Sequence, residues 1–436
     1  MTPPENRNGP RVTRTTRVLP QQSASHECAV PLSLLDATTA KFALSSAIWL
    51  IERPTVSLTS TDLTNHLRTA LSSTLDSLPL ETMTFPVHAK RYGRVHVHYG
   101  TTTDPGVEFV EATSIANVDS LYTAESAKER PIWIRQGDEE ALTQFVPLTE
   151  VAPALEPNET DTNGLYGSNL AIQCTVLARG GFVLATKIAH PLADITALTY
   201  SMRDWYSPSR AMLTAAPLPV LSPSFDPSRL DASAAGDINA DPPTPFLDLP
   251  LAGKPMPWAE WDTKAPVNQC TVHFSWKQIE HLWQSAIQEN SPTSADLKIS
   301  KHDALLAEGP VHCDLTLATR PVFQLDDSFI GSPTMTMDIE MTAADLASRR
   351  LGAIARRIRE TLSTVNHPRR LAAHLHSITW YEKSPQRIWQ AFLGSRHILV
   401  TTVLGLARVF IVSILDWDLA FAWMAILIGD GPPSVL

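Results

Sequence analysis

The sequence lacks the excess of positive charge and the clustered cysteines that mark several large classes of protein. Its 35 lysines and arginines are outnumbered by 45 acidic residues, so the formal net charge is −10. Nucleic acids bind to positively charged faces, and the chain has no basic stripe, so we expect no nucleic-acid partner. The four cysteines lie far apart without a Cys-x-x-Cys spacing. This pattern argues against a metal site or a disulfide framework and predicts a cytoplasmic location.

The sequence also has no secretory signal and no clear membrane-spanning segment. Its N-terminus is rich in arginine and threonine without the apolar core of a signal peptide. We predict a flexible tail over residues 1–25, with a transit peptide as the alternative. The longest apolar run, residues 398–415, contains Arg408, whose burial in a bilayer costs at least about 2.5 kcal/mol. The β-branched residues of this run favour buried strands over a membrane helix, so we expect no membrane partner.

A chain of 436 residues is too long for one hydrophobic core. Single cores stop growing at roughly 250–300 residues, so scaling alone predicts two domains. A stretch dense in proline, which sustains neither a helix nor a central strand, marks the break between them. We therefore predict an N-terminal domain over residues 26–206, a proline-rich crossover over 207–265 and a C-terminal domain over 266–436.

Two apolar runs rich in β-branched residues precede the most informative loop of the chain. They cover residues 171–178 and 182–189 and are joined by Arg-Gly-Gly at 179–181, where glycine supplies the positive φ of a tight turn. The pattern predicts a buried hairpin. Its second strand leads directly into His190, which is therefore expected at the edge of the sheet.

The residues around His190 predict a strand, a loop and a helix in succession. Pro191 cannot continue the strand ladder, and Asp194 stands where an N-cap precedes a predicted helix over residues 195–206. A histidine with the ordinary pKa of about 6.5 is mostly neutral near pH 7, so His190 is a candidate general base. The spacing alone favours another interpretation, a buried structural histidine beside a plain helix cap.

Two other pairs of histidines are given structural interpretations. His96 and His98 alternate along a predicted strand and share one face, but no nearby carboxylates complete a metal site, which favours an exposed strand face. His374 and His376 lie in a basic segment with helical character, where a spacing of two places them on different faces. We interpret this second pair as surface residues.

A series of short segments runs along the chain in the order found in one enzyme family. They are VPLSLLDA at 30–37, AIWL at 47–50, GRV at 93–95, DPGVEF at 104–109, the His190 loop, PWAEW at 257–261, SKHDAL at 300–305 and SFIGSP at 328–333. Together they resemble the BAHD acyltransferases, in the fungal branch that includes trichothecene acetyltransferase-like proteins. The first two segments look like the family's opening strand and helix. The resemblance covers about residues 26–420.

The resemblance implies both a fold and a reaction. The fold is of the α/β (α+β) class and is similar to chloramphenicol acetyltransferase, with two domains and an active-site channel between them. The reaction is transfer of an acyl group from coenzyme A to a hydroxyl, with His190 as general base. We expect acetyl-CoA as co-substrate, no permanently bound cofactor, a fungal secondary metabolite as acceptor, and a monomeric enzyme.

The resemblance also assigns roles to further residues. The family aspartate points away from the histidine, so Asp194 is expected to shape the catalytic loop through an ion pair with Arg320. That arginine stands eleven positions before Gly331, as a family arginine does. Ser300 and Lys301 match a segment that borders the acyl donor, although Lys301 could equally be a solvated charge at the start of a helix.

The chain departs from the family pattern in its C-terminal half. Asp416 and Trp417 begin a glycine-free substitute for the family signature Asp-Phe-Gly-Trp-Gly, and Gly309-Pro310 halts a helix that the family continues. These departures leave open an inactive paralogue that only binds metabolites, or an error in the gene model. A condensation-type enzyme with a carrier-bound donor is a further alternative, although Ala189 replaces the first histidine of its His-His-x-x-x-Asp motif. The sequence does not identify the acceptor.

Overall fold

The computed structural model describes residues 9–22, 26–39, 45–51, 59–78, 82–84, 95–102, 104–121, 132–133, 142–148, 168–233, 271–272, 276–289, 312–340, 351–365, 367–380, 397–401 and 424–428. Ser300, Lys301, Asp416 and Trp417 lie outside these ranges, as do residues 308–310. The described part contains two large hydrophobic cores, one in each half of the molecule.

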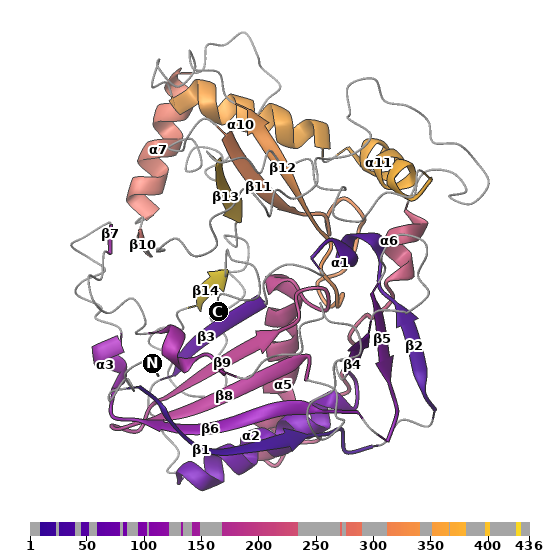
Figure 1. The fold of residues 1–436 in the computed structure, drawn as a ribbon. Helices are drawn as coiled ribbons and strands as arrows, with labels where there is room; N and C mark the ends of the chain where they lie inside the picture. Colours follow the sequence, from indigo (N-terminus) through magenta and orange to yellow (C-terminus); the bar gives the residue numbers. More distant parts are fainter. Residues whose placement is uncertain are drawn as a thin grey trace, which may run out of the picture.

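A six-stranded mixed sheet forms the N-terminal half (Figure 1). Its strand order is β1-β6-β8-β9-β3-β14, in which β6 and β8 run parallel and the other neighbouring pairs are antiparallel. The last strand comes from the C-terminal end of the chain and pairs with β3. The strands are β1 (Arg11–Val18), β3 (Ser45–Ile51), β6 (Val107–Ser114), β8 (Leu170–Leu177), β9 (Phe182–Ile188) and β14 (Met424–Ile428).

The predicted hairpin is confirmed by β8 and β9. The two strands pair antiparallel, and Gly180 in the turn between them has a φ of 93°. Both strands are buried along nearly their whole length because helices cover one face of the sheet and a small apolar cluster covers the other. Burial on both faces explains their continuous apolar sequence.

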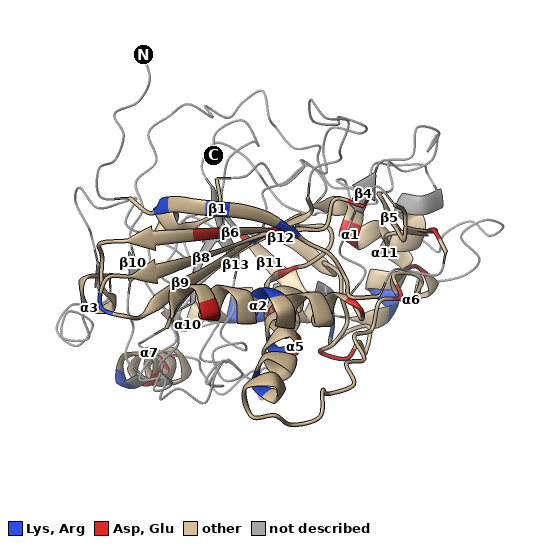
Figure 2. Cartoon of the chain, turned by 90° about the horizontal axis from the view of Figure 1, so that it is seen from below, with Lys and Arg blue, Asp and Glu red and all other residues tan. Residues whose placement is uncertain are grey.

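Residues 11–18, within the predicted flexible tail of residues 1–25, form strand β1 instead. It is an edge strand whose arginines lie beside acidic residues of β6, as the view from below shows (Figure 2). Arg17 pairs with Glu108 at 3.1 Å, and Arg14 lies 3.9 Å from Glu111. The threonines and valines of this segment favour a strand, a signal that its arginine-rich composition obscured.

Two helices, α2 (Ser60–Leu75) and α5 (Ile195–Leu213), pack together against the sheet. Helix α5 continues through Pro208 to Leu213, beyond its predicted end at residue 206. Proline removes one backbone donor from a helix. The next residue, Ser209, is buried, and its Oγ lies 2.9 Å from His66 Nε2 of α2. Tertiary packing thus outweighs the helix-breaking tendency of the proline.

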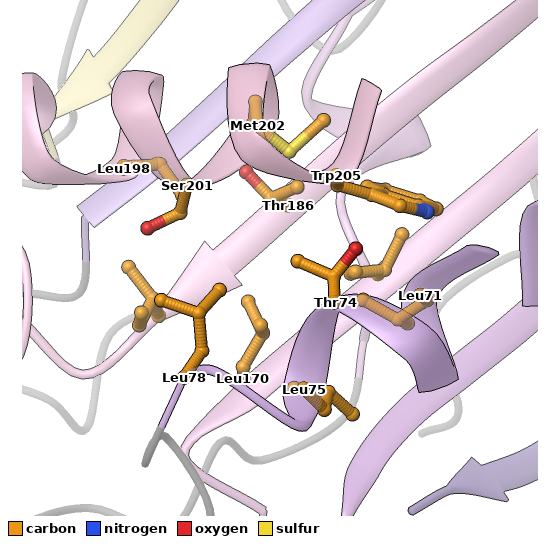
Figure 3. A pocket seen from close by; sticks show the side chains of 12 residues that line it. Leu71, Thr74, Leu75, Leu78, Leu170, Thr186, Leu198, Ser201, Met202 and Trp205 are labelled. Atoms are coloured by element: carbon orange, nitrogen blue, oxygen red, sulfur yellow. The ribbon is translucent and has the colours of Figure 1, made fainter. Parts of the chain in front are cut away.

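A small apolar cavity lies between these helices and the sheet (Figure 3). Leu71, Thr186 and Trp205 are among the side chains around it, and its volume is about 20 Å³. A space of this size holds about one water molecule. The cavity is therefore a packing gap in the hydrophobic core of the N-terminal half and is too small for an acyl-CoA or an acceptor.

A second, three-stranded sheet has the order β2-β5-β4 and leads into a short helix. The family segment at 30–37 contains both a strand and a helix, whereas the segment at 47–50, which resembled the family helix, lies in strand β3. These elements are β2 (Cys28–Pro31), α1 (Leu34–Thr38), β4 (Thr82–Thr84) and β5 (His96–Tyr99).

The histidine pair of β5 lies on one partly exposed face. The rings of His96 and His98 are stacked with their centroids 6.3 Å apart. In the described part of the chain, no group of three or more His, Cys, Asp or Glu residues could hold a metal ion.

The C-terminal half contains a three-stranded sheet of order β12-β11-β13 covered by helices (Figure 1). Its core includes Leu315, Met337 and Ile358. Its elements are α7 (Trp276–Glu289), β11 (His312–Ala318), β12 (Thr334–Glu340), α10 (Leu351–Val365), α11 (Pro368–Trp380) and β13 (His397–Thr401). Further short elements are α3 (Val118–Leu121), β7 (Ile132–Trp133), η1 (Thr143–Phe145), α6 (Ser228–Ala232) and β10 (Thr271–Val272), of which β7 and β10 pair antiparallel.

This architecture confirms the predicted α/β fold class, with a separate core in each half. The predicted limits of the crossover stay a prediction. The interpretation of His374 and His376 as surface residues was wrong, because both side chains are buried in α11, with exposures of 5% and 2%. Helix α11 is buried across consecutive positions, so a spacing of two did not distinguish an outward face.

The described start of the apolar run at 398–415 is a strand, and a second strand lies beyond the end of the run. Strand β13 lies at its start and β14 follows it, while residues 402–423 are outside the described ranges. Among the described helices, none is long and apolar enough to cross a membrane.

Candidate active site

His190 lies directly beyond the end of β9, where the strand ladder stops. The backbone N–H of Ala189 donates to Asn169 O at 2.9 Å, and two tight turns follow, with Leu192 N–H bonded to Ala189 O and Ala193 N–H bonded to His190 O. Ala189 and Leu192 are fully buried, whereas His190 is partly exposed. The loop is therefore anchored by its apolar residues and presents the imidazole at its surface.

The imidazole of His190 contacts a serine from the other half of the molecule. His190 Nδ1 lies 3.0 Å from Ser332 Oγ. Burial lowers the pKa of His190 below its ordinary value, and a hydrogen bond with its own backbone and the charge of Asp194 oppose this shift in part. The ring is thus mostly neutral near pH 7, and in the tautomer protonated at Nδ1 the lone pair of Nε2 can accept a proton.

Asp194 forms the predicted N-cap of α5 and the predicted ion pair. Its Oδ1 accepts from Ala197 N–H at 2.8 Å and from Arg320 Nη2 at 2.9 Å, while its Oδ2 accepts from Arg320 Nη1 at 3.3 Å. The two charged side chains are only 5% and 6% exposed. A buried, bidentate pair of this kind is costly to disrupt from one side, because the remaining charge is left without a partner.

Arg320 also ties down the segment that carries Ser332. Its Nη2 donates to Phe329 O at 3.1 Å and to Gly331 O at 3.2 Å. The backbone N–H of Asp194 donates to Gly331 O as well, at 3.1 Å. The His190 loop and the segment at 329–332 are therefore joined by both main-chain and side-chain hydrogen bonds.

Asp36 of α1 contacts the same segment from the opposite side. Its Oδ1 accepts from the backbone N–H of Ser332 at 2.6 Å, and its Oδ2 accepts from Ser33 Oγ at 2.6 Å and Ser33 N at 3.0 Å. Burial raises the pKa of Asp36 to about 6, and the hydrogen bonds to the serines offset this in part. Asp36 is fully buried, although α1 is a helix of only five residues.

The structure thus brings together three of the residues selected from the sequence, His190, Asp194 and Arg320. Sequence reasoning assigned no role to Asp36 or Ser332, although both lay within the segments that resemble the family. A Ser-x-x-Asp capping box at Ser33 was visible in the sequence and could have drawn attention to Asp36. The contact between Ser332 and His190 carried no local signal, because it joins residues 142 positions apart.

Comparison with known proteins gives matches along most of the chain. The model of the transferase family matches residues 11–307. The chain is similar to Acyltransferase AFT15-1 of Alternaria alternata, with 26% identity over an alignment of 459 positions that covers 90% of this chain and 83% of the relative.

Solved structures with the same fold support this similarity. F. graminearum TRI101, in a complex with coenzyme A and deoxynivalenol, gives a TM-score of 0.57 at 14% identity, covering 86% of this chain and 84% of the other. Vinorine synthase gives a TM-score of 0.51 at 17% identity, covering 90% and 83%. At these identities the likeness establishes the two-domain fold.

Proposed function

Because this chain belongs to the transferase family of BAHD acyltransferases, we propose that it moves an acetyl group from acetyl-CoA to a hydroxyl of a fungal secondary metabolite, with His190 as the general base. The chain is an acyltransferase of this family by its match over residues 11–307 and its similarity to a curated fungal acyltransferase. The proposal adds the donor, the kind of acceptor and the residue that moves the proton.

The placement of His190 is the observation that carries the proposal. The ring is held at the end of a buried strand, its pKa is lowered by burial, and Nδ1 is engaged by Ser332. In the proposed reaction the acceptor oxygen attacks the thioester carbonyl carbon while His190 Nε2 takes the hydroxyl proton. The carbon–sulfur bond then breaks, and the proton passes from the imidazolium to the coenzyme A thiolate. Base catalysis of this kind contributes about 10²–10⁴-fold.

Similarity supports the choice of donor and acceptor class. The F. graminearum TRI101 structures contain coenzyme A together with deoxynivalenol or T-2 mycotoxin, both in complex with that protein. We propose that Ser300 and Lys301 border the donor here, and that Asp416 and Trp417 fill the place of the family's C-terminal signature. We also propose a cytoplasmic monomer.

The condensation-type alternative is disfavoured by the surroundings of Ala189. The first histidine of the condensation motif would replace this alanine, which is fully buried in the first core and bonded through its N–H to Asn169. An imidazole at this position would overpack the core and bury a polar ring. The inactive-paralogue alternative is addressed by the assay that follows and by whether coenzyme A raises the melting temperature.

The first test is thiol release from acetyl-CoA in the presence of a panel of hydroxylated fungal metabolites. We expect acceptor-dependent release by the wild type and a loss of about 10²–10⁴-fold in His190→Ala. Because burial lowers the pKa of His190, kcat/KM should fall only below pH 6.5. His98→Ala, which alters a partly exposed histidine of β5, is the matched control and should keep the wild-type rate. Equal rates for His190→Ala and wild type would remove His190 from the mechanism.

A further inference from the structure

Ser332 lies where the two halves of the molecule meet and makes a polar contact with each of two distant segments. Its backbone N–H donates to Asp36 Oδ1 at 2.6 Å, and its Oγ lies 3.0 Å from His190 Nδ1. Ser332 and Asp36 are fully buried. A hydrogen-bonded path therefore runs from the carboxylate of Asp36 through Ser332 to the imidazole of His190.

Asp36 is held in one position by its surroundings, so that its carboxylate can fix the position of Ser332. Its helix α1 lies between the two halves of the molecule (Figure 1), with Leu34 and Leu35 in the C-terminal core and Ala37 in the N-terminal core. The capping box fixes the carboxylate, since Ser33 donates twice to Oδ2 and leaves Oδ1 for Ser332. A carboxylate that served only to cap a short helix would not need to be buried completely.

The segment that carries Ser332 is shaped to reach Asp36. Gly331 has a φ of 149°, and a Cβ atom there would lie 2.9 Å from Asp36 Oδ1 and 2.8 Å from the ring of Phe329. The absence of a side chain lets the backbone pass over α1 closely enough for the hydrogen bond at Ser332. The carbonyl of Gly331 is held on its other side by Arg320 and by the N–H of Asp194.

We propose that Asp36 and Ser332 form a positioning unit that holds Nδ1 of His190 in its protonated form, so that Nε2 carries the lone pair used in catalysis. This inference rests on the proposed function, in which His190 is the base. Ser332 Oγ accepts the Nδ1 proton and fixes the ring plane, and Asp36 acts through the main chain of Ser332. In the opposite tautomer the serine would donate to Nδ1, and Nε2 would carry the proton and could not accept one.

The direction of a pKa change distinguishes these two tautomers. If Ser332 Oγ accepts from Nδ1, removing the hydroxyl destabilises the charged imidazolium more than the neutral imidazole, and the pKa of His190 falls. If the serine donates to the neutral ring, its hydroxyl can turn to accept from the imidazolium, so its removal destabilises both forms and leaves the pKa of His190 unchanged or raised. The charged neighbours Asp194, Arg320 and Asp36 are unchanged in Ser332→Ala, so the shift reports on the hydroxyl.

The experiment measures the rate at which diethyl pyrocarbonate modifies His190 in the full chain between pH 5 and 8, read by mass spectrometry. This reagent attacks the neutral imidazole, and His190 is partly exposed. In Ser332→Ala we expect the midpoint pH to fall by about half a unit to one unit, because hydrogen bonds to charged groups are the stronger ones. Ser332→Thr keeps a hydroxyl and should restore the wild-type midpoint. A midpoint that rises or does not move in Ser332→Ala overturns the proposal.

A kinetic measurement tests the effect on catalysis, using acetyl-CoA and the acceptor that gives the fastest thiol release. Ser332→Ala should lower kcat by about 10–10²-fold through misplacement of the ring, with an unchanged KM for acetyl-CoA. Asp36→Ala should lower kcat in the same way, whereas Asp36→Asn keeps an oxygen acceptor and should retain more activity. If Asp36→Ala does not melt cooperatively, Ser332→Ala and Asp36→Asn still decide the question.

The control is Asp62→Ala in α2, because Asp62 forms the same kind of capping contact with Thr59 at a helix start outside the site. It should lower stability without lowering kcat. If His190→Ala loses activity while Ser332→Ala keeps the wild-type kcat, the positioning unit is wrong and the proposed function stands. If His190→Ala keeps the wild-type rate, the assignment of the base is wrong, and with it the catalytic role of Ser332.

Discussion

At the scale of single residues, the candidate site depends on a few buried polar groups whose partners lie far away in the sequence. The single side chain of Arg320 donates hydrogen bonds to three residues, Asp194, Phe329 and Gly331. Each of these bonds is made away from bulk water, so losing one partner exposes the full desolvation cost of the other. The His190 loop should therefore be more sensitive to Arg320 than to any charge on the surface.

The buried ion pair gives a stability prediction of its own. Arg320→Leu should lower the free energy of unfolding by about 3–5 kcal/mol, because Asp194 is left charged and buried. The double variant Asp194→Asn/Arg320→Leu should lose less than the sum of the two single variants, since asparagine still caps α5 and no charge remains unpaired. Denaturant unfolding of the four proteins measures this coupling.

The matched control for the ion pair is Arg229→Leu, which removes the exposed partner of Asp326. Exposed pairs of this kind contribute about 0–1 kcal/mol, so this variant should unfold close to the wild type. Additive losses in the Asp194 and Arg320 variants would mean that the two side chains do not stabilise each other.

At the scale of elements, two glycines with positive φ have different tasks. Gly180 forms the turn between β8 and β9, and Gly331 passes over α1. Gly331→Ala should lower both stability and kcat, because its Cβ would displace the backbone that holds Ser332. Gly180→Ala introduces strain at a turn outside the site and should lower stability by about 1–2 kcal/mol while leaving kcat unchanged. Thermal melts with kcat measurements check both variants, and equal kcat losses would contradict this difference.

The elements also show how far sequence reasoning reached. The β8–β9 hairpin and the cap at Asp194 were predictable because each depends on neighbouring residues, such as the glycine at position 180. Strand β1 was missed because its partner residues in β6 lie far away in the sequence, and their charges compensate its arginines. The burial of His374 and His376 was missed for a related reason, since packing around α11 comes from distant segments. The Asp36–Ser332 contact could not be predicted because it forms only when the two halves meet.

At the scale of the whole molecule, protonation of Asp36, where the two halves meet, affects the stability of the fold. The pKa of Asp36 is raised to about 6 in the folded protein from an ordinary value of 3.8. The protonated carboxyl therefore contributes fully to the free energy of unfolding below pH 3.8, and this contribution is lost as pH rises through about 6. Asp36→Asn cannot ionise, so its stability relative to the wild type should improve between pH 4 and 7, by up to about 3 kcal/mol. Thermal unfolding of both proteins across this range measures the change, and a constant difference would show that Asp36 does not titrate near 6.

The pairing of β14 with β3 also bears on how the protein is made. During synthesis the ribosome releases β3 early, while β14 follows only after the whole C-terminal half has been translated. Until then the edge of β3 has unpaired backbone groups, and such edges are templates for association between nascent chains. The longer the interval between synthesis of β3 and synthesis of β14, the more the nascent chain should need chaperones in an expression host. Slower translation of the C-terminal half should therefore lower the yield of native enzyme.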